Sequence, residues 1–234
     1  MKTLTVGDLH GKDVWKEIDT IRYDKIIFVG DYVDCFTTSN VEIKHNLEQI
    51  IRYKKDNMDK VVLLLGNHDV QYTTMSNSHL ICSGYRPVML HDLYQIFYNN
   101  YDIFQIAYQI DNYLWTHAGV HEAWHEKRYL PWMELMIPKY KDFSLLEGLE
   151  EMYKNRAEPL YDVGYYRGGR HPIGGPLWLD QMYGREKPLK GYHQIVGHSK
   201  VKEIKTHIID KDTSITFTDI LDSISTRFYE LNIK

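Results

Sequence analysis

The sequence predicts an α/β protein, a sandwich of two mixed β-sheets with helices on the outside. Three short apolar runs near the N-terminus have the composition of strands that are buried on both faces: residues 4–6, 26–29 and 61–65. Apolar residues at helical spacing separate these runs, so the strands should be parallel and joined by right-handed crossovers. Three stretches near the C-terminus predict antiparallel strands, separated by short polar turns: residues 203–209, 214–220 and 226–233.

Length and composition indicate one domain over residues 1–234, since the chain is 43% hydrophobic and can form a core of that size. The formal net charge of −4 argues against capture of nucleic acid. Two cysteines are too few for a disulfide framework. No apolar run approaches the ~20 residues of a membrane span, and Met1 leads straight into a strand without a signal peptide. We therefore expect a cytoplasmic protein, with its oligomeric state open.

The elements between the strands follow from local patterns. Residues 14–21 predict a crossover helix. Ser39 with Glu42 predicts a capping box that begins a helix with an apolar stripe up to Tyr53 and an end at Asp56-Asn57. Residues 72–80 are polar and predict a loop or a frayed helix, whereas 88–98 predict a helix. The alternation over residues 103–110, followed by Asp111-Asn112, predicts a hairpin into a strand that starts at Tyr113.

The middle of the chain is harder to interpret. Residues 121–157 predict a helical insertion, with breaks at two prolines and core positions at four apolar residues: Pro131 and Pro138, then Trp124, Leu135, Leu145 and Leu146. Residues 161–191 predict a long Gly-rich loop with aromatic and arginine side chains. Loops of this length in compact domains are usually functional or disordered, and the aromatic residues favour an ordered, substrate-facing loop.

Each of the first three strands ends in a polar phrase. The phrases are Gly7-Asp8-Leu9-His10-Gly11, Gly30-Asp31-Tyr32-Val33-Asp34 and Gly66-Asn67-His68-Asp69. One phrase alone is equally well explained as a turn with a capping Asp or Asn. Three in this order favour a shared site, because ligands of open α/β sheets bind outside the carboxyl ends of the strands.

The side chains in these phrases suit divalent ions of intermediate hardness. Asp, Asn and neutral His bind manganese, iron or zinc, and we expect manganese first. Asp8 and His10 are two residues apart and can face one ion, while the carboxylate of Asp31 can bridge two. Two ions ~3.5–4 Å apart can hold the attacking and leaving oxygens of a phosphoryl displacement.

These phrases resemble the calcineurin-like metallophosphoesterase superfamily, and more nearly its branch of Ser/Thr protein phosphatases and symmetrical diadenosine tetraphosphate hydrolases. The resemblance continues at Tyr113–Val120, which contains His117, and at Gln194–Ser199, which contains His198. It thus spans residues 4–199 and implies a four-layer αββα sandwich. The resemblance also implies two divalent ions and a site assigned residue by residue: Asp8, His10 and Asp31 on the first metal; Asp31, Asn67, His117 and His198 on the second; His68 as the general acid; Asp34 orienting it.

Three positions depart from the family pattern. In the protein-phosphatase branch an arginine that grips phosphate follows the position of Asp34, but this chain has Cys35. That branch usually has glutamate where this chain has Asp69. In diesterases of the superfamily a second histidine often stands where this chain has Lys200, so we expect monoesters to be preferred.

Another cation should replace the missing arginine. Arg167 and Arg170 of the Gly-rich loop are the best candidates, because the neighbouring glycines let the backbone approach closely; Arg86 and Lys200 come next. The alternative is that both loop arginines are solvated charges.

The sequence leaves four functions open. The first is a phosphomonoesterase that attacks with a metal-bridging hydroxide, acting on phosphorylated small molecules or, as a Ser/Thr protein phosphatase, on phosphoproteins. The second is a hydrolase of dinucleoside polyphosphates or other nucleotides. A non-catalytic binding module is disfavoured by the complete set of ligands, and a nuclease by the acidic balance.

Overall fold

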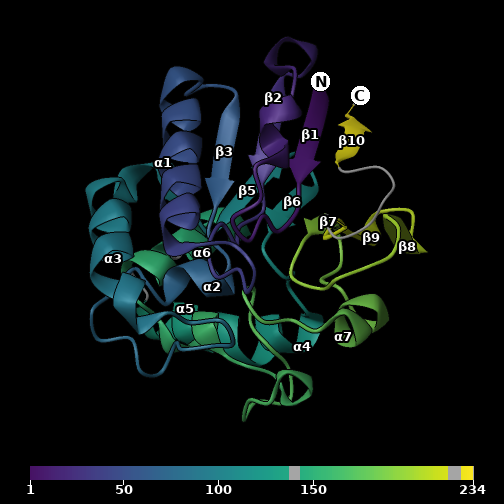
Figure 1. Cartoon of the computed structure of the whole chain (residues 1–234). Coiled ribbons are helices and arrows are strands. Elements are labelled where there is room, and N and C mark those ends of the chain that lie inside the picture. Colours follow the sequence, from purple (N-terminus) through teal and green to yellow (C-terminus); the bar gives the residue numbers. More distant parts are fainter. Residues whose placement is uncertain (137–142, 221–227, 234) are drawn as a thin grey trace. The chain divides into compact units, whose positions relative to one another are not determined.

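The computed structural model describes residues 1–136, 143–220 and 228–233. It contains two five-stranded mixed sheets flanked by helices, which confirms the predicted fold class (Figure 1). The chain divides into two compact units, which are Met1–Gln105 with Asp219–Lys234, and Ile106–Thr218. Each unit contains one of the sheets. Within the described ranges, no helix combines the length and the apolar composition that crossing a membrane requires.

The first unit contains a sheet of strand order β10-β1-β2-β3-β4. Its strands are β1 (Lys2–Val6), β2 (Lys25–Phe28), β3 (Val61–Leu64), β4 (Phe104–Gln105) and β10 (Tyr229–Asn232). The first four run parallel, and most of their side chains are buried because both faces of the sheet are covered. The register pairs Val6 with Phe28 and Phe28 with Leu63, so the carboxyl ends of β1, β2 and β3 lie at one edge.

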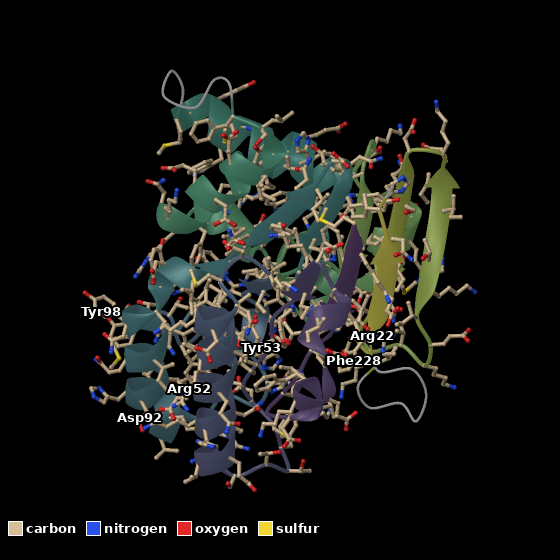
Figure 2. All side chains as sticks on the ribbon, turned by 90° about the horizontal axis from the view of Figure 1, so that it is seen from above. Arg22, Arg52, Tyr53, Asp92, Tyr98 and Phe228 are labelled. Carbon is tan, nitrogen blue, oxygen red and sulfur yellow. The ribbon has the colours of Figure 1, made fainter. Side chains whose placement is uncertain are left out.

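Two longer helices accompany this sheet, α1 (Asn40–Asp56) and α3 (Leu90–Asn99). The predicted capping box is confirmed, because Ser39 and Glu42 each accept a main-chain N–H of the other. The ring of Tyr53 on α1 lies 5.3 Å from that of Trp15, whereas Tyr98 on the outer side of α3 is exposed (Figure 2). A 3₁₀ turn, Pro87–Met89, leads into α3, and another, Tyr101–Ile103, follows it.

The prediction of a helix in the crossover over residues 14–21 is wrong. Two 3₁₀ turns, Val14–Glu17 and Thr20–Arg22, stand there, separated by an extended residue at Ile18. The side chain of Asp19 accepts the N–H of Ile21 at 3.1 Å. Asp side chains that bond to the nearby backbone in this way compete with helix formation, which periodicity alone does not register.

The second unit contains a sheet of strand order β5-β6-β7-β9-β8. Its strands are β5 (Ala107–Ile110), β6 (Tyr113–Thr116), β7 (His193–Val196), β8 (Lys205–Asp210) and β9 (Thr213–Phe217). The hairpin predicted at Asp111-Asn112 is confirmed between β5 and β6. Strands β6, β7 and β9 are parallel, so His117 and His198 both follow strands that end at the same edge.

The C-terminal strands only partly match the prediction. Strands β8 and β9 form the expected antiparallel hairpin, but β9 also pairs in parallel with β7. The last strand, β10, does not extend this hairpin and instead pairs with β1 of the first sheet. Of the predicted turn and strand start, residues 221–227 lie outside the described residues.

The helical insertion consists of α4 (Glu122–Trp124), a π-helix (His125–Tyr129), α5 (Leu130–Met136) and α6 (Leu145–Lys154). Trp124 and Leu145 are buried as predicted, but Leu135 is 81% exposed, so that core assignment is wrong. The break expected at Pro131 is also wrong. The helix takes π geometry just before the proline, and such bulges accommodate a missing N–H. Pro138 lies outside the described residues.

The Gly-rich segment was predicted as a loop, but part of it is helical. A 3₁₀ turn, Glu158–Tyr161, leads into the predicted loop over residues 161–191, and part of that loop is a second 3₁₀ turn, Tyr165–Arg167, and a helix, α7 (Gln181–Glu186). Asp180 begins α7 as its N-cap by accepting the N–H of Met182 at 2.9 Å. In the first unit, a short helix, α2 (Asn67–Val70), follows the end of β3 after two intervening residues, with Gly66 as its N-cap.

Candidate metal and phosphate site

Close backbone contact joins the loops after β2 and β3. Gly30 has a φ of +107°, and a Cβ there would lie 2.4 Å from the main-chain nitrogen of Gly66. A Cβ on Gly66 would lie 2.1 Å from Oδ1 of Asp31. These two glycines therefore do more than allow turns, because only residues without a Cβ let the loops approach this closely.

Asp69 ties the same loops together. Its fully buried carboxylate accepts three main-chain N–H groups, from Asp31 at 2.7 Å, Tyr32 at 2.9 Å and Gly66 at 2.8 Å. Burial, followed by the nearby charge of Asp31, raises the pKa of Asp69 well above its usual value. In the sequence, Asp69 stood out only because the protein-phosphatase branch usually has glutamate at this position. Its place three residues after Gly66, where a first-turn carboxylate reaches back to the cap, was the signal for this role.

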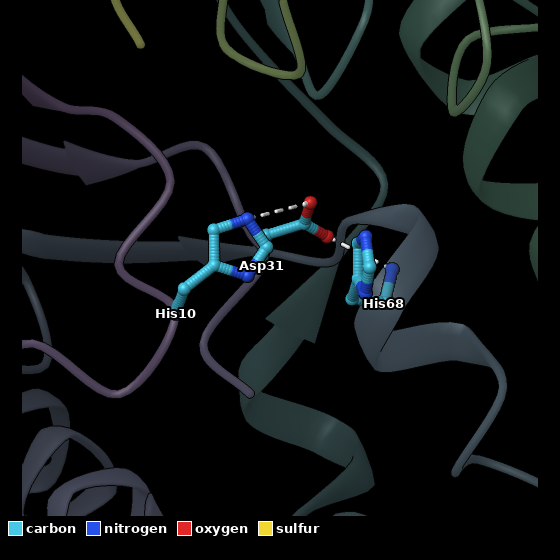
Figure 3. Close-up of side chains that lie close together, drawn as sticks. All are labelled: His10, Asp31 and His68. Atoms are coloured by element: carbon cyan, nitrogen blue, oxygen red, sulfur yellow. Dashed lines mark hydrogen bonds and ion pairs between the residues drawn. The ribbon is translucent and has the colours of Figure 1, made fainter. Parts of the chain in front are cut away.

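Two predicted site residues, His10 and His68, converge on the carboxylate of a third, Asp31, in the first unit (Figure 3). Nε2 of His10 lies 3.8 Å from Oδ2 of Asp31, and the main-chain N–H of His68 donates to Oδ1 of Asp31 at 2.9 Å. The rings of His10 and His68 meet edge to face, with centroids 4.9 Å apart. Three strand-end loops thus deliver two imidazoles and a carboxylate to one place, as the phrases predict.

His10 is arranged as a neutral ligand. Its Nδ1 lies 2.9 Å from the carbonyl oxygen of Val33, which fixes the proton on Nδ1 and leaves the lone pair of Nε2 towards Asp31. Burial lowers the pKa of His10, and this outweighs the charge of Asp31. Two ligands of one ion with bonds of about 2.1 Å can lie up to about 4.2 Å apart, so the separation of 3.8 Å fits a shared cation.

Asp34 and His68 form the pair that the resemblance implies. Nδ1 of His68 lies 3.1 Å from Oδ2 of Asp34, and both side chains are largely buried. Burial alone would lower the pKa of His68, but the carboxylates of Asp31 and Asp34 outweigh it and raise the pKa to about 12. The imidazole is therefore protonated at neutral pH, and its Nε2–H is the proton that does not face Asp34.

Two residues that the sequence did not single out hold Asp34. The hydroxyl of Tyr72 donates to Oδ1 at 2.6 Å, and the amide of Gln71 donates to Oδ2. Burial raises the pKa of Asp34, although hydrogen bonds from His68 and Tyr72 oppose that rise. Both residues lie in the stretch just after α2. Periodicity gave no signal for them, because their function depends on the contact with Asp34, 37 and 38 residues away.

The outer layer of this network includes residues 77–86. The hydroxyl of Tyr72 accepts the N–H of Arg86 at 2.8 Å, and its ring stacks on that of Tyr85 with centroids 5.4 Å apart. Gln71 accepts the N–H of Cys82 at 3.1 Å. Sγ of Cys82 lies 3.7 Å from Nδ1 of His68. This segment therefore buttresses the Asp34–His68 pair.

Several predicted site residues have a left-handed backbone. Of the six described non-glycine residues with positive φ, four are His10, Asp31, Asp34 and His198, at 45°, 55°, 62° and 62°. Asp and His are among the residues that tolerate this region best, yet each such residue costs energy. Strained conformations concentrate where a site imposes them.

The two histidines of the second unit also meet. Nε2 of His117 lies 3.2 Å from Nδ1 of His198, and the rings are 5.0 Å apart at 68°. Their parallel strands β6 and β7 are neighbours, which explains the convergence. Two nitrogens bound to one ion at about 2.0–2.1 Å and at roughly tetrahedral or right angles lie about 3.0–3.4 Å apart. The pair therefore fits cis ligands of one cation.

Asp8 and Asn67 occupy the expected loops in the first unit. Both side chains are buried, with Asp8 just after β1 and Asn67 at the start of α2. The amide nitrogen of Asn67 lies 3.6 Å from Sγ of Cys82, so its oxygen is the atom suited to a cation. The donor set of carboxylates, imidazoles and one amide fits the predicted divalent ions.

The candidate phosphate-binding arginines differ in their surroundings. Arg167 donates to the hydroxyl of Ser199, next to His198, at 2.5 Å and pairs with Asp180 at 2.9 Å. Arg170 is exposed. The guanidinium of Arg86, a second-rank candidate, is engaged by Asn40 and by the carbonyl oxygens of Cys35 and Thr38, at 3.0 Å for Thr38. Arg86 is therefore structural.

Comparisons with known proteins show the family and the fold. A family model described as calcineurin-like phosphoesterase matches residues 1–203. A solved structure of a cold-active protein-tyrosine phosphatase from a psychrophilic Shewanella is 15% identical, with 94% of this chain and 71% of that chain covered and a TM-score of 0.51. Another structure of a cold-active protein tyrosine phosphatase is also 15% identical, with 94% and 69% covered and a TM-score of 0.53. At this identity the likeness concerns the fold. No curated protein matches the sequence.

Proposed function

Since the chain belongs to the calcineurin-like phosphoesterase family, and so is a hydrolase acting on phosphate esters, we propose that it cleaves phosphomonoesters with the help of two divalent metal ions. One observation carries the proposal above all. His10 and the main chain of His68, from two other strand-end loops, lie within ligand or hydrogen-bonding distance of the Asp31 carboxylate. A fold alone needs no such convergence.

The residues that would hold the ions are those the resemblance names. By that resemblance, Asp8, His10 and Asp31 would supply the first set, and Asp31 with Asn67, His117 and His198 would supply the second. Bound there, manganese, iron or zinc would polarise the phosphate and make a bound water acidic enough to act as the nucleophile near neutral pH. His10 supports this assignment because its neutral tautomer directs Nε2 towards Asp31.

His68 is proposed to protonate the leaving oxygen. Its Nδ1 is engaged by Asp34, so Nε2 is the nitrogen free to give its proton to the substrate. A catalytic proton donor must be protonated at the working pH, and the raised pKa of His68 meets that condition. Charge on a bound cation beside Asp31 would offset part of the carboxylate's effect and bring the pKa nearer to neutral.

Monoesters are proposed over diesters. Lys200 stands where many diesterases of the superfamily place a further histidine, so the chain offers the first ion fewer ligands. Phosphorylated small molecules and phosphoproteins are both possible substrates. A nucleotide or dinucleoside polyphosphate is the second candidate, because Tyr165 and Tyr166, 59% and 58% exposed, offer faces on which a base can stack.

The test is hydrolysis of phenyl phosphate by chelated protein, before and after manganese is added back. We expect turnover only with the metal. Asp31→Asn should bind less manganese and lose activity, yet it should remain folded, since asparagine also tolerates the left-handed backbone of this position. Lys211→Ala, at an exposed turn of the second unit, is the matched control. Full activity in chelator would reject the metal-dependent mechanism.

A further inference from the structure

A basic groove of about 290 Å³ lies in the second unit, at the start of the β8–β9 hairpin and beside α7. Six of the side chains that line it are Arg185, Lys200, Lys202, Lys205, His207 and Phe217. Glu203 is the one acidic residue among those lining it. The four lysine and arginine side chains are exposed, so their charges face the solvent and any ligand.

The topology explains why these cations gather. The register pairs Phe217 at the end of β9 with Val196 at the end of β7 and with Lys205 at the start of β8. Three strands therefore meet at one edge, and α7 lies beside them (Figure 1). The guanidinium of Arg185 on α7 sits over the ring of Phe217, 5.6 Å from its centroid.

The charges converge instead of neutralising one another. The ring of His207 lies 6.0 Å from that of Phe217, over which Arg185 sits, and burial and then the charges of Arg185 and Lys205 lower the pKa of His207. Among the described residues, Arg185, Lys202 and Lys205 have no carboxylate within the 4.0 Å of an ion pair. Arg185 instead donates to the side-chain oxygen of Gln181 at 2.8 Å. Like charges held together favour an anion at this place.

The groove also begins beside a predicted metal ligand. Lys200 lines it and follows His198 by two residues, which a fully extended chain spans in at most about 7 Å. This edge holds the carboxyl ends of β7 and β9, where ligands of such sheets bind. A molecule bound by one phosphate at His198 can therefore extend another anionic group into the groove.

We propose that this basic groove binds a second phosphate group of the substrate, one that is not hydrolysed, so that the preferred substrates carry two or more phosphates. The inference rests on the proposed function, since it concerns the substrate of that site. Arg185, Lys202 and Lys205 supply the charge-assisted contacts, and the ring of Phe217 supports the guanidinium.

The test compares alkane-1,n-diol bisphosphates of graded length with alkyl monophosphates of matched length. We expect kcat/KM to favour the bisphosphate by about tenfold at one best length. This is well beyond the statistical advantage that a bisphosphate has because either of its two equivalent ends can react. Arg185→Ala, Lys202→Ala and Lys205→Ala should each reduce that preference by about threefold to tenfold. Monophosphate turnover should stay unchanged, as it should in Lys211→Ala at the opposite end of the hairpin.

A binding measurement separates this inference from the proposed function. Inorganic pyrophosphate should protect Lys202 and Lys205, but not Lys211, from acetylation by acetic anhydride, and added salt should weaken the protection. If monophosphates are not cleaved at all, the proposed function fails, and the protection still decides whether the groove binds phosphate. Missing protection would overturn the inference. Protection without a bisphosphate preference would make the groove a site for free anions and reject its assignment to the substrate.

Discussion

The hydroxyl of Tyr72 donates a 2.6 Å hydrogen bond to the carboxylate of Asp34, which in turn contacts His68. The same hydroxyl accepts the N–H of Arg86, so the tyrosine links the candidate proton donor to a distant loop. We expect Tyr72→Phe to lower kcat several-fold for alkyl phosphates without changing KM or metal content. If the substitution only damaged the fold, less protein would be active, and the measured activity towards every substrate would fall by the same factor.

The same variant should also be less stable. Removing the hydroxyl leaves the N–H of Arg86 and one oxygen of Asp34 without this partner, which costs about 1–3 kcal/mol for a buried group. Urea unfolding measures the loss. Tyr98→Phe is the control, because Tyr98 is exposed and should change neither stability nor kcat. If kcat of the Tyr72→Phe variant depends on the leaving group in the same way as kcat of the unchanged protein, Tyr72 has no positioning role.

His68→Asn should affect substrates according to their leaving groups. A general acid contributes ~10²–10⁴-fold, mostly where the leaving oxygen is basic. Turnover of an alkyl phosphate should therefore fall far more than that of nitrophenyl phosphate. Manganese content should persist, because His68 contacts Asp31 through its main chain. Equal losses on both substrates would assign His68 to another role.

Arg167 and Arg170 should separate in a pairwise test. Arg167 contacts Ser199, the neighbour of His198, so Arg167→Ala should lower kcat/KM by about tenfold and weaken inhibition by free phosphate. Arg170 is exposed, and its replacement by alanine should have little effect. If neither change alters turnover or phosphate inhibition, the loop does not hold the phosphate.

Cys35 should react as a thiolate near neutral pH. Burial would raise the pKa of its thiol, but hydrogen bonds from the hydroxyl and N–H groups of Thr37 and Thr38 outweigh it and lower the pKa to about 7. The hydroxyl of Thr38 donates to Sγ at 3.2 Å. Because the thiolate is the nucleophile, alkylation by iodoacetamide should rise with pH to a half-maximum near 7.

The experiment uses a Cys82→Ser background, so that only Cys35 is labelled. Thr38→Val removes one donor and should move the half-maximum of the pH–rate curve to higher pH. A half-maximum near 8.5, about the value of an ordinary cysteine, would reject this account of the loop. Cys35 is half-buried, so its thiol is not enclosed in the core.

Gly66→Ala should destabilise the first unit strongly. The new methyl group would lie 2.1 Å from Oδ1 of Asp31 and 2.6 Å from its main-chain nitrogen, so the loop must shift. We expect a loss of about 3 kcal/mol or more in urea unfolding, together with weaker manganese binding. Gly191→Ala is the control, since nothing lies within 4 Å there and only the left-handed backbone costs about 1–2 kcal/mol. Equal losses would show that the close approach is unimportant.

Local patterns in the sequence determined the parallel core and the places of the polar phrases. Short apolar runs fix β1, β2 and β3, because a strand buried on both faces must be apolar throughout. The Ser39–Glu42 box fixes the start of α1, because capping depends on neighbours three residues apart. Glycine followed by Asp, Asn or His placed His10, Asp31 and His68 at the strand ends, where the structure brings them together.

Only the tertiary structure decided what each side chain contacts. The partners of Asp34 in α2 and just after it are 34–38 residues away, and no periodicity encodes such a pair. Pairing of β10 with β1 joins residues 228 positions apart, whereas local alternation predicts only that a strand exists. The basic groove likewise arises where α7, β8 and β9 meet. Packing between distant elements selects these contacts, because each depends on geometry that a single segment does not contain.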